Sequence, residues 1–197
     1  MSRIRGNGYS ATTVDQLCAD AGVTKGGFFY HFKSKDALAL AAADYWTAAN
    51  ALQLEEASYH RHSDPLDRVL SYLDFRKAMF KRKIPEFTCL FGTMVQEVYE
   101  SHPEICKVCG AGIVGHAKTI EADIAAAMKM HRIRATWTAA SLALYTQAVL
   151  QGAIILAKAT GNAQIAESTI DHLRQYLELL FGRSRGKKAK AVSRSIQ

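Results

Sequence analysis

The chain has 197 residues, of which 49% are hydrophobic and 22% are charged, so it can bury a core, and an intrinsically disordered chain is excluded. Its formal net charge of +7 is uneven, with five basic and two acidic residues within 1–35 and six basic and no acidic residues within 183–197. Basic ends on a slightly acidic body favour a polyanionic partner such as nucleic acid. For the tail at 183–197, a solubilising disordered extension is an equal alternative to DNA contact.

The residues after Met1 lack the apolar core of a secretion signal, and the few cysteines do not suit a disulfide scaffold. Both observations predict a cytoplasmic protein. One stretch, 139–159, is apolar enough to suggest a membrane span. Because it contains Gln147, Gln151 and Lys158, a helix buried between protein surfaces is favoured instead, and no membrane partner is expected.

Apolar residues repeat with helical spacing almost throughout, and no strict alternation indicates a strand, so the sequence predicts an all-α fold. The three prolines fall between periodic segments, where each suits the first turn of a helix, and Gly22, Gly161 and Gly182 suit helix ends. The predicted helices span 13–21, 25–32, 35–57, 65–82, 86–100, 103–130, 136–159 and 163–181.

The first two predicted helices form a compact unit. The side chains of Thr13 and Gln16 can satisfy each other's backbone N–H groups in a capping box. Gly22 can end the first helix in a left-handed conformation, and Thr24 can cap the second. Two short helices joined by such a turn are typical of a helix-turn-helix unit, whose second helix lies in the major groove of DNA.

The start of the second helix suits contact with a phosphate backbone. Thr24 and Lys25 lie at the helix N-terminus, where free N–H groups and the helix dipole attract anions. Gly26 and Gly27 each cost about 1 kcal/mol relative to alanine in a helix. Close approach of the backbone to DNA would offset that cost.

The aromatic residues of this helix divide into two groups. Phe28 and Phe32 are four residues apart and are expected to face the core. Tyr30 and His31 point elsewhere and can reach bases or backbone, and Lys35 follows within range of a phosphate. The alternative is that the whole aromatic cluster is core.

The stretch GYSATTVDQLCADAGVTKGGFFYHFKSKDAL, residues 8–38, resembles the DNA-binding head of TetR/AcrR-type transcriptional regulators. The resemblance implies a helix-turn-helix head at 1–45 and a helical effector-binding and dimerisation domain at 46–182. Phe29 stands where the family often has tyrosine, so its ring would touch a thymine methyl group rather than bond a phosphate. The DNA contacts implied by position are Thr13, Thr24, Lys25, Gly26, Gly27, Phe29, Tyr30, His31 and Lys35.

The sequence departs from the family pattern upstream of Gly8. The family usually has a full amphipathic first helix there, whereas only seven residues precede Gly8, and Ile4 is the sole large apolar one after Met1. We expect the faces around Leu17, Phe28 and Phe32 to be partly open to solvent. Either the true start lies upstream, or the head is shortened.

The body is expected to hold a ligand pocket and a dimer interface. The segment 136–159 is apolar on two faces, so one side is expected to pack in its own domain and the other needs a second cover, which a dimer formed through 136–159 and 163–181 would supply. A deep monomer core is the alternative. The resemblance implies an effector pocket in the preceding helices, with polar groups such as Arg76 setting specificity. The predicted pocket residues are Tyr72, Phe75, Met79, Phe91, Met94, Ile113, His116, Tyr145 and Gln147.

The function expected from this combination is a repressor that a small molecule releases from double-stranded operator DNA. A dimeric small-molecule-binding protein with a shortened head and impaired DNA binding is the alternative. No catalytic arrangement or phosphate loop is apparent, so neither an enzyme nor a cofactor is expected.

A metal or thiol-sensing site is a further alternative for one helix. His102, Cys106, Cys109 and His116 fall on one helical face. Because His102 and His116 would stand about 21 Å apart at the helical rise, a single helix cannot supply four ligands to one ion. Buried cysteines and surface histidines are favoured, and no metal is expected.

Overall fold

The structure, a computed structural model, describes residues 1–183, and within this part every regular element is a helix, which confirms the all-α prediction. Apart from Arg183, the predicted tail lies outside the described residues. The elements are α1 (Ser2–Asn7), α2 (Val14–Ala21), α3 (Lys25–His31), α4 (Lys35–Glu55), η1 (Ser58–Arg61, a 3₁₀ helix), α5 (Pro65–Met79), α6 (Ile84–Phe87), α7 (Leu90–Val98), α8 (Pro103–Met130), α9 (Ala139–Thr160) and α10 (Ala163–Leu180).

Side-chain caps fix the short helices of the head. Thr13 and Gln16 form the reciprocal capping box at the start of α2, and the hydroxyl of Thr24 accepts from the N–H of Gly27 in α3. Gly22 ends α2 with a left-handed φ of 66°. Each side-chain cap stabilises its helix by about 1 kcal/mol. The turn between α2 and α3 therefore follows from local chemistry that the sequence already contains.

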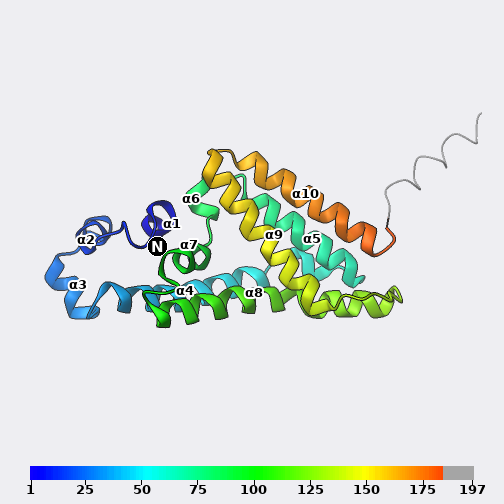
Figure 1. Cartoon of the computed structure of the whole chain (residues 1–197), viewed down its shortest axis with the longest axis horizontal. Helices are drawn as coiled ribbons and strands as arrows, with labels where there is room; N and C mark the ends of the chain where they lie inside the picture. Colours follow the sequence, from blue (N-terminus) through cyan, green and yellow to red (C-terminus); the bar gives the residue numbers. More distant parts are fainter. Residues whose placement is uncertain (184–197) are drawn as a thin grey trace, which may run out of the picture.

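The molecule is elongated, with α2 and α3 at one end and a bundle of α5, α8, α9 and α10 at the other (Figure 1). Helix α4 begins beside α3 and packs along α8 toward the bundle. The larger apolar cluster fills the bundle around residues such as Leu73 and Ile124. A second cluster joins Ile4 and Tyr9 of the head to Met94 and other residues of α4, α7 and α8. The head is thus packed onto the body rather than tethered to it.

Helix α9 is the one helix within residues 1–183 that is long and apolar enough to cross a membrane. It packs against both α8 and α10, and one side of it, including Leu142, Leu150 and Ala153, is buried in the core. This packing supports the interpretation of 139–159 as a core helix.

The predicted helix at 86–100 is wrong in one respect, because it is two helices. Thr88 has an extended conformation between α6 and α7. The Sγ atom of Cys89 accepts from the N–H of Gly92 and caps α7. The apolar spacing is uninterrupted across this break, so periodicity alone does not reveal it.

Helices α1 and η1 are additional to the predicted elements. Helix α1 has six residues and is anchored by Ile4, which is 1% exposed. Helix η1 is anchored by Tyr59, which packs edge-on against Tyr72 of α5. One buried side chain therefore holds each of these short elements in place.

Candidate nucleic-acid interface and ligand pocket

Helices α2 and α3 pack together and leave the outer surface of α3 free. Phe28 is 6% exposed and contacts the rings of Phe29 and Phe32. Tyr30 is 85% exposed, and its ring meets that of the exposed His31 edge-on at 5.0 Å. The helix thus buries one aromatic side chain and presents three to solvent, namely Phe29, Tyr30 and His31.

The two glycines of α3 are not required by the fold itself. A Cβ atom on Gly26 would meet only the hydroxyl of Thr24, at 3.8 Å, and one on Gly27 would meet the same atom at 3.4 Å. Neither glycine has a left-handed φ. Nothing within residues 1–183 requires glycine at these two positions, although glycine destabilises a helix relative to alanine. Close approach of another molecule to this backbone would account for both glycines.

The predicted polar contacts differ in how freely they can reach DNA. The hydroxyls of Thr13 and Thr24 cap their helices, and Lys25 forms an exposed ion pair with Asp15 at 2.9 Å. Such an exposed pair is weak and can exchange for a phosphate.

Lys35 is more constrained than the sequence suggested. Its Nζ donates to the carbonyl oxygens of Tyr9 and Thr12, each at 3.1 Å, and lies 4.2 Å from the centre of the Tyr9 ring. Two of the three ammonium donors are therefore used within the protein. Lys35 holds the segment before α2 in place, and one donor is left for a phosphate.

A carboxylate that the sequence interpretation missed fastens the head to the body. Glu97 of α7 accepts from the N–H of Tyr9 at 3.0 Å and from the N–H of Ser10 at 2.7 Å. Gly8 lies against it with φ of 96°, and a Cβ atom there would come within 2.5 Å of Glu97 Oε1. Tyr9, whose pKa is raised by burial, donates from its hydroxyl to Asp36 of α4. Movements of α7 and α4 are thereby linked to the segment that enters α2.

The head has an open apolar groove beside α1. The groove, of about 700 Å³, is lined by α1, α2, α3 and the start of α4, including Leu17, Phe28 and Phe32. Leu17 and Phe32 are half-buried. The part of this core next to α1 is therefore partly open.

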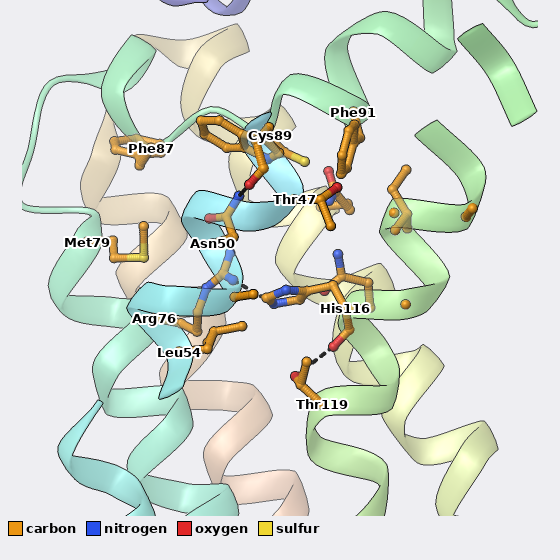
Figure 2. Close-up of a pocket in the computed structure, with 18 of the residues that line it drawn as sticks. Thr47, Asn50, Leu54, Arg76, Met79, Phe87, Cys89, Phe91, His116 and Thr119 are labelled. Atoms are coloured by element: carbon orange, nitrogen blue, oxygen red, sulfur yellow. Dashed lines mark hydrogen bonds between the residues drawn. The ribbon is translucent and has the colours of Figure 1, made fainter. Parts of the chain in front are cut away.

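The body contains a cavity of about 490 Å³ between α4, α5, α6, α7, α8 and α9. Figure 2 shows side chains from several of these helices converging on one space. Of the predicted pocket residues, those in its lining are Met79, Phe91, Ile113, His116 and Gln147. Helix α4 was not predicted to contribute, but it lines the cavity with five residues, Trp46, Thr47, Asn50, Ala51 and Leu54.

Four of the predicted pocket residues lie outside this lining. Tyr72 and Met94 are fully buried in the apolar clusters, and Phe75 packs against the bundle core. Tyr145 is exposed and its ring packs against Tyr176 of α10. Because α9 has two apolar faces, the sequence did not show which face Tyr145 occupies.

A small polar cluster stands at the cavity wall. The Nε2 atom of His116 accepts from Nη1 of Arg76 at 2.7 Å and lies 2.9 Å from the hydroxyl oxygen of Tyr72, which also interacts with Arg76. Burial, and after it the positive charge of Arg76, lowers the pKa of His116 to about 3. The imidazole is therefore neutral at physiological pH, and with its proton on Nδ1 the lone pair of Nε2 accepts from Arg76.

The four residues of the alternative metal or thiol site are not brought together. His102 lies 3.8 Å from Asp36, and His116 belongs to the cavity cluster. Cys106 and Cys109 are unpaired thiols, and burial raises the pKa of Cys109 to about 12. Within the described part of the chain, no group of three His, Cys, Asp or Glu side chains is arranged to hold a metal ion.

Helices α9 and α10 carry several large apolar side chains that are exposed, and the rings of Tyr145 and Tyr176 join the two helices at a centroid distance of 5.3 Å. Ala148 is also exposed, and Gly152 is half-buried. The large exposed residues on the outer side of α9 and α10 are Leu144, Tyr145, Ile155, Leu156, Tyr176 and Leu179.

The chain is similar over most of its length to known regulators. An uncharacterized HTH-type transcriptional regulator in the lacX 3′ region of Lactococcus lactis subsp. lactis is 24% identical over 171 residues, 87% of this chain and 85% of that protein. The uncharacterized HTH-type transcriptional regulator YerO of Bacillus subtilis (strain 168) is 33% identical over 63 residues, 32% of this chain, so the matched region spans only 22% of YerO.

A solved structure and two family domains agree with these similarities. The crystal structure of a TetR transcriptional regulator from Chloroflexus aurantiacus J-10-FL has a TM-score of 0.76 and 28% identity, covering 89% of this chain and 88% of that one. Residues 4–42 match the TetR family of bacterial regulatory proteins, and residues 65–173 match the tetracyclin repressor-like C-terminal domain. The chain therefore belongs to the TetR family of transcriptional regulators, which are not enzymes.

Proposed function

We propose that the chain is a cytoplasmic, homodimeric repressor that leaves double-stranded operator DNA when a small-molecule effector occupies the cavity of the body. The observation that carries this proposal is the course of α4. Its first residue follows Ser34, just after the exposed helix α3, and its later residues Trp46, Thr47 and Asn50 line the cavity. A ligand that displaces α4 would therefore move α3.

The contacts of Glu97 supply a second connection between cavity and head. Helix α7, which carries Glu97, also contributes Phe91 to the cavity lining. An effector that binds better to one position of α4 and α7 would favour that position of the two heads in the dimer. Recognition helices related by a two-fold axis occupy half-sites about 34–36 Å apart, so a small rotation of the heads is enough to lose one half-site.

The outer surface of α9 and α10 supports the homodimer. An apolar surface of this extent is unusual on a monomer, and Ala148 and Gly152 allow close approach of two copies of α9. Two helices from each protomer would form a four-helix interface that covers this surface.

Titration of labelled DNA tests the proposal. The DNA upstream of the chain's own gene should bind at least about a thousandfold more tightly than a scrambled duplex at physiological salt. Affinity should fall steeply as salt is raised, because the basic head releases counterions from phosphates.

The alternative function is a dimeric small-molecule-binding protein with impaired DNA binding. The open groove beside the six-residue α1 favours it, because a loosely packed head holds α3 less firmly. Equal and weak binding to the upstream and scrambled duplexes would support this alternative and contradict the repressor.

A further inference from the structure

Arg76 carries a positive charge at the wall of an apolar cavity without an acidic partner. No ion pair within residues 1–183 includes it. Its Nη1 atom donates to the neutral His116, the guanidinium also interacts with the hydroxyl of Tyr72, and its Nε atom is buried and donates no hydrogen bond to the described residues. Glu86 is the one carboxylate of the lining, and it is exposed and interacts with Arg5 of α1.

The bond to His116 determines which part of the guanidinium remains for another partner. With Nη1 engaged, the edge formed by Nε and Nη2 is left, and this planar pair of donors matches two oxygens of a carboxylate or sulfonate. Figure 2 shows Arg76 extending from α5 toward His116 among the cavity side chains. The Nε atom is shielded, so an anion reaches this edge after a small rotation of the guanidinium plane.

A second polar group of the lining is also unpaired. Gln147 is 6% exposed, and its Oε1 atom is buried and accepts no hydrogen bond from the described residues. A buried acceptor without a donor is desolvated without compensation, so a bound N–H or O–H donor would stabilise it. Both Arg76 and Gln147 are thus unsatisfied groups of one cavity, which a ligand with complementary groups would satisfy.

The rest of the cavity is suited to an apolar body. Its volume of about 490 Å³ is within the range of small-molecule sites, about 300–1,000 Å³. Trp46, Met79, Phe87 and Phe91 supply large apolar surfaces around it.

We propose that the effector is an amphipathic organic anion whose carboxylate or sulfonate binds Arg76, whose apolar rings fill the cavity, and whose N–H or O–H donates to Gln147. That this ligand is an effector depends on the proposed function, whereas its binding to the cavity can be measured without DNA. The Nε2 atom of His116 accepts from Nη1, so Nε and Nη2 are the donors that remain for the anion.

Two fluorescent dyes form a matched test. The dye 8-anilinonaphthalene-1-sulfonate is an organic anion, and N-phenyl-1-naphthylamine has the same rings and N–H without the sulfonate. The full-length protein should bind the sulfonate at least about tenfold more tightly than the neutral dye. In Arg76→Gln the two dissociation constants should become nearly equal, mainly through weaker binding of the sulfonate.

Two further variants show whether charge at this position is responsible. Arg134→Gln removes the same charge from an exposed residue outside the cavity and should keep the selectivity of the unmodified protein. Arg76→Lys keeps the charge but not the planar donor pair, and should give intermediate selectivity. It also provides a readout if Arg76→Gln fails to fold, as judged by circular dichroism.

The inference is overturned if the unmodified protein binds both dyes equally, or if Arg134→Gln loses as much selectivity as Arg76→Gln. It is also overturned if Arg76→Gln, or Arg76→Lys where the first variant does not fold, keeps the full selectivity of the unmodified protein. Its failure is distinguishable from that of the proposed function. If the neutral dye binds tightly and releases operator DNA, the repressor function is supported and the anionic effector is refuted. If binding of the sulfonate depends on Arg76 but never affects operator binding, the anion site is supported and the repressor function is refuted.

Discussion

Tyr30 and Phe28 are two positions apart in α3, yet their exposed fractions are 85% and 6%. An aromatic side chain left in water contributes little to folding, so its presence on this surface is better explained by what it contacts outside the chain. His31 beside it adds a group that can donate to a base or a phosphate. Residue by residue, α3 is divided between a side that stabilises the head and a side that is available to DNA.

Replacing Tyr30 by alanine should separate these two sides. We expect operator affinity to fall by about 1–3 kcal/mol, because one groove contact is lost, while the free energy of unfolding changes by less than about 0.5 kcal/mol. Tyr45→Ala is the matched control, because Tyr45 is 63% exposed on α4 outside the helix-turn-helix. DNA titration and urea unfolding of both variants measure the two quantities. An equal loss of affinity in both variants would refute the role of Tyr30.

The sequence was sufficient where a residue's role depends on its near neighbours. Thr13, Gln16 and Thr24 act as caps, as their spacing from the bonded N–H groups requires. Contacts between distant segments gave no such signal. Glu97 reads as part of a solvated helix face, and only the fold brings it to Tyr9, which is 88 positions away.

At the level of elements, periodicity and capping signals located the long helices and the short α2 and α3, but missed α1, η1 and the break between α6 and α7. Helix α8 has the predicted bounds because an uninterrupted apolar repeat follows Pro103. In α9, periodicity showed two apolar faces but not which of them faces the cavity. Both Gln147 and Tyr145 were therefore predicted to line it, whereas only Gln147 does. The joint between head and body is made of α1, α6 and α7, where hydrogen bonds and caps decide the structure.

Substitution of two glycines tests this joint. Gly8→Ala should destabilise the protein by more than Gly22→Ala, although both glycines have a positive φ. At Gly22 a Cβ atom meets nothing within 4 Å, so the cost is the left-handed backbone alone, about 1 kcal/mol. At Gly8 it would also displace Glu97 from two backbone N–H groups. Equal free energies of unfolding for the two variants would show that Glu97 does not hold the head.

At the level of the whole molecule, we propose separate roles for three regions: DNA contact for the outer side of α3, effector binding for the cavity, and dimerisation for the outer side of α9 and α10. The second apolar cluster connects the first two, because it contains residues of α1, α4, α7 and α8. The sequence predicted each of these regions but not their positions relative to one another. The structure shows that α4, which begins at the head and ends in the body, connects the head to the cavity (Figure 1).

The dimer surface can be tested independently of DNA. Leu156→Glu should convert the dimer to a monomer at micromolar concentration, because two buried carboxylates would face each other across α9. Leu52→Glu is the control, because Leu52 is 60% exposed on α4, outside this surface. Light scattering should give the mass of one chain for the first variant and of two for the second. A dimer in both variants would place the interface elsewhere.

The most direct test of the whole account is reciprocity between cavity and head. The operator dissociation constant is measured with and without whichever of the two dyes binds, and the dye dissociation constant with and without operator. If α4 couples the sites, each ligand weakens the other by the same factor, about 5- to 150-fold. Operator and dye that bind together, each with unchanged affinity, would contradict a repressor controlled from this cavity.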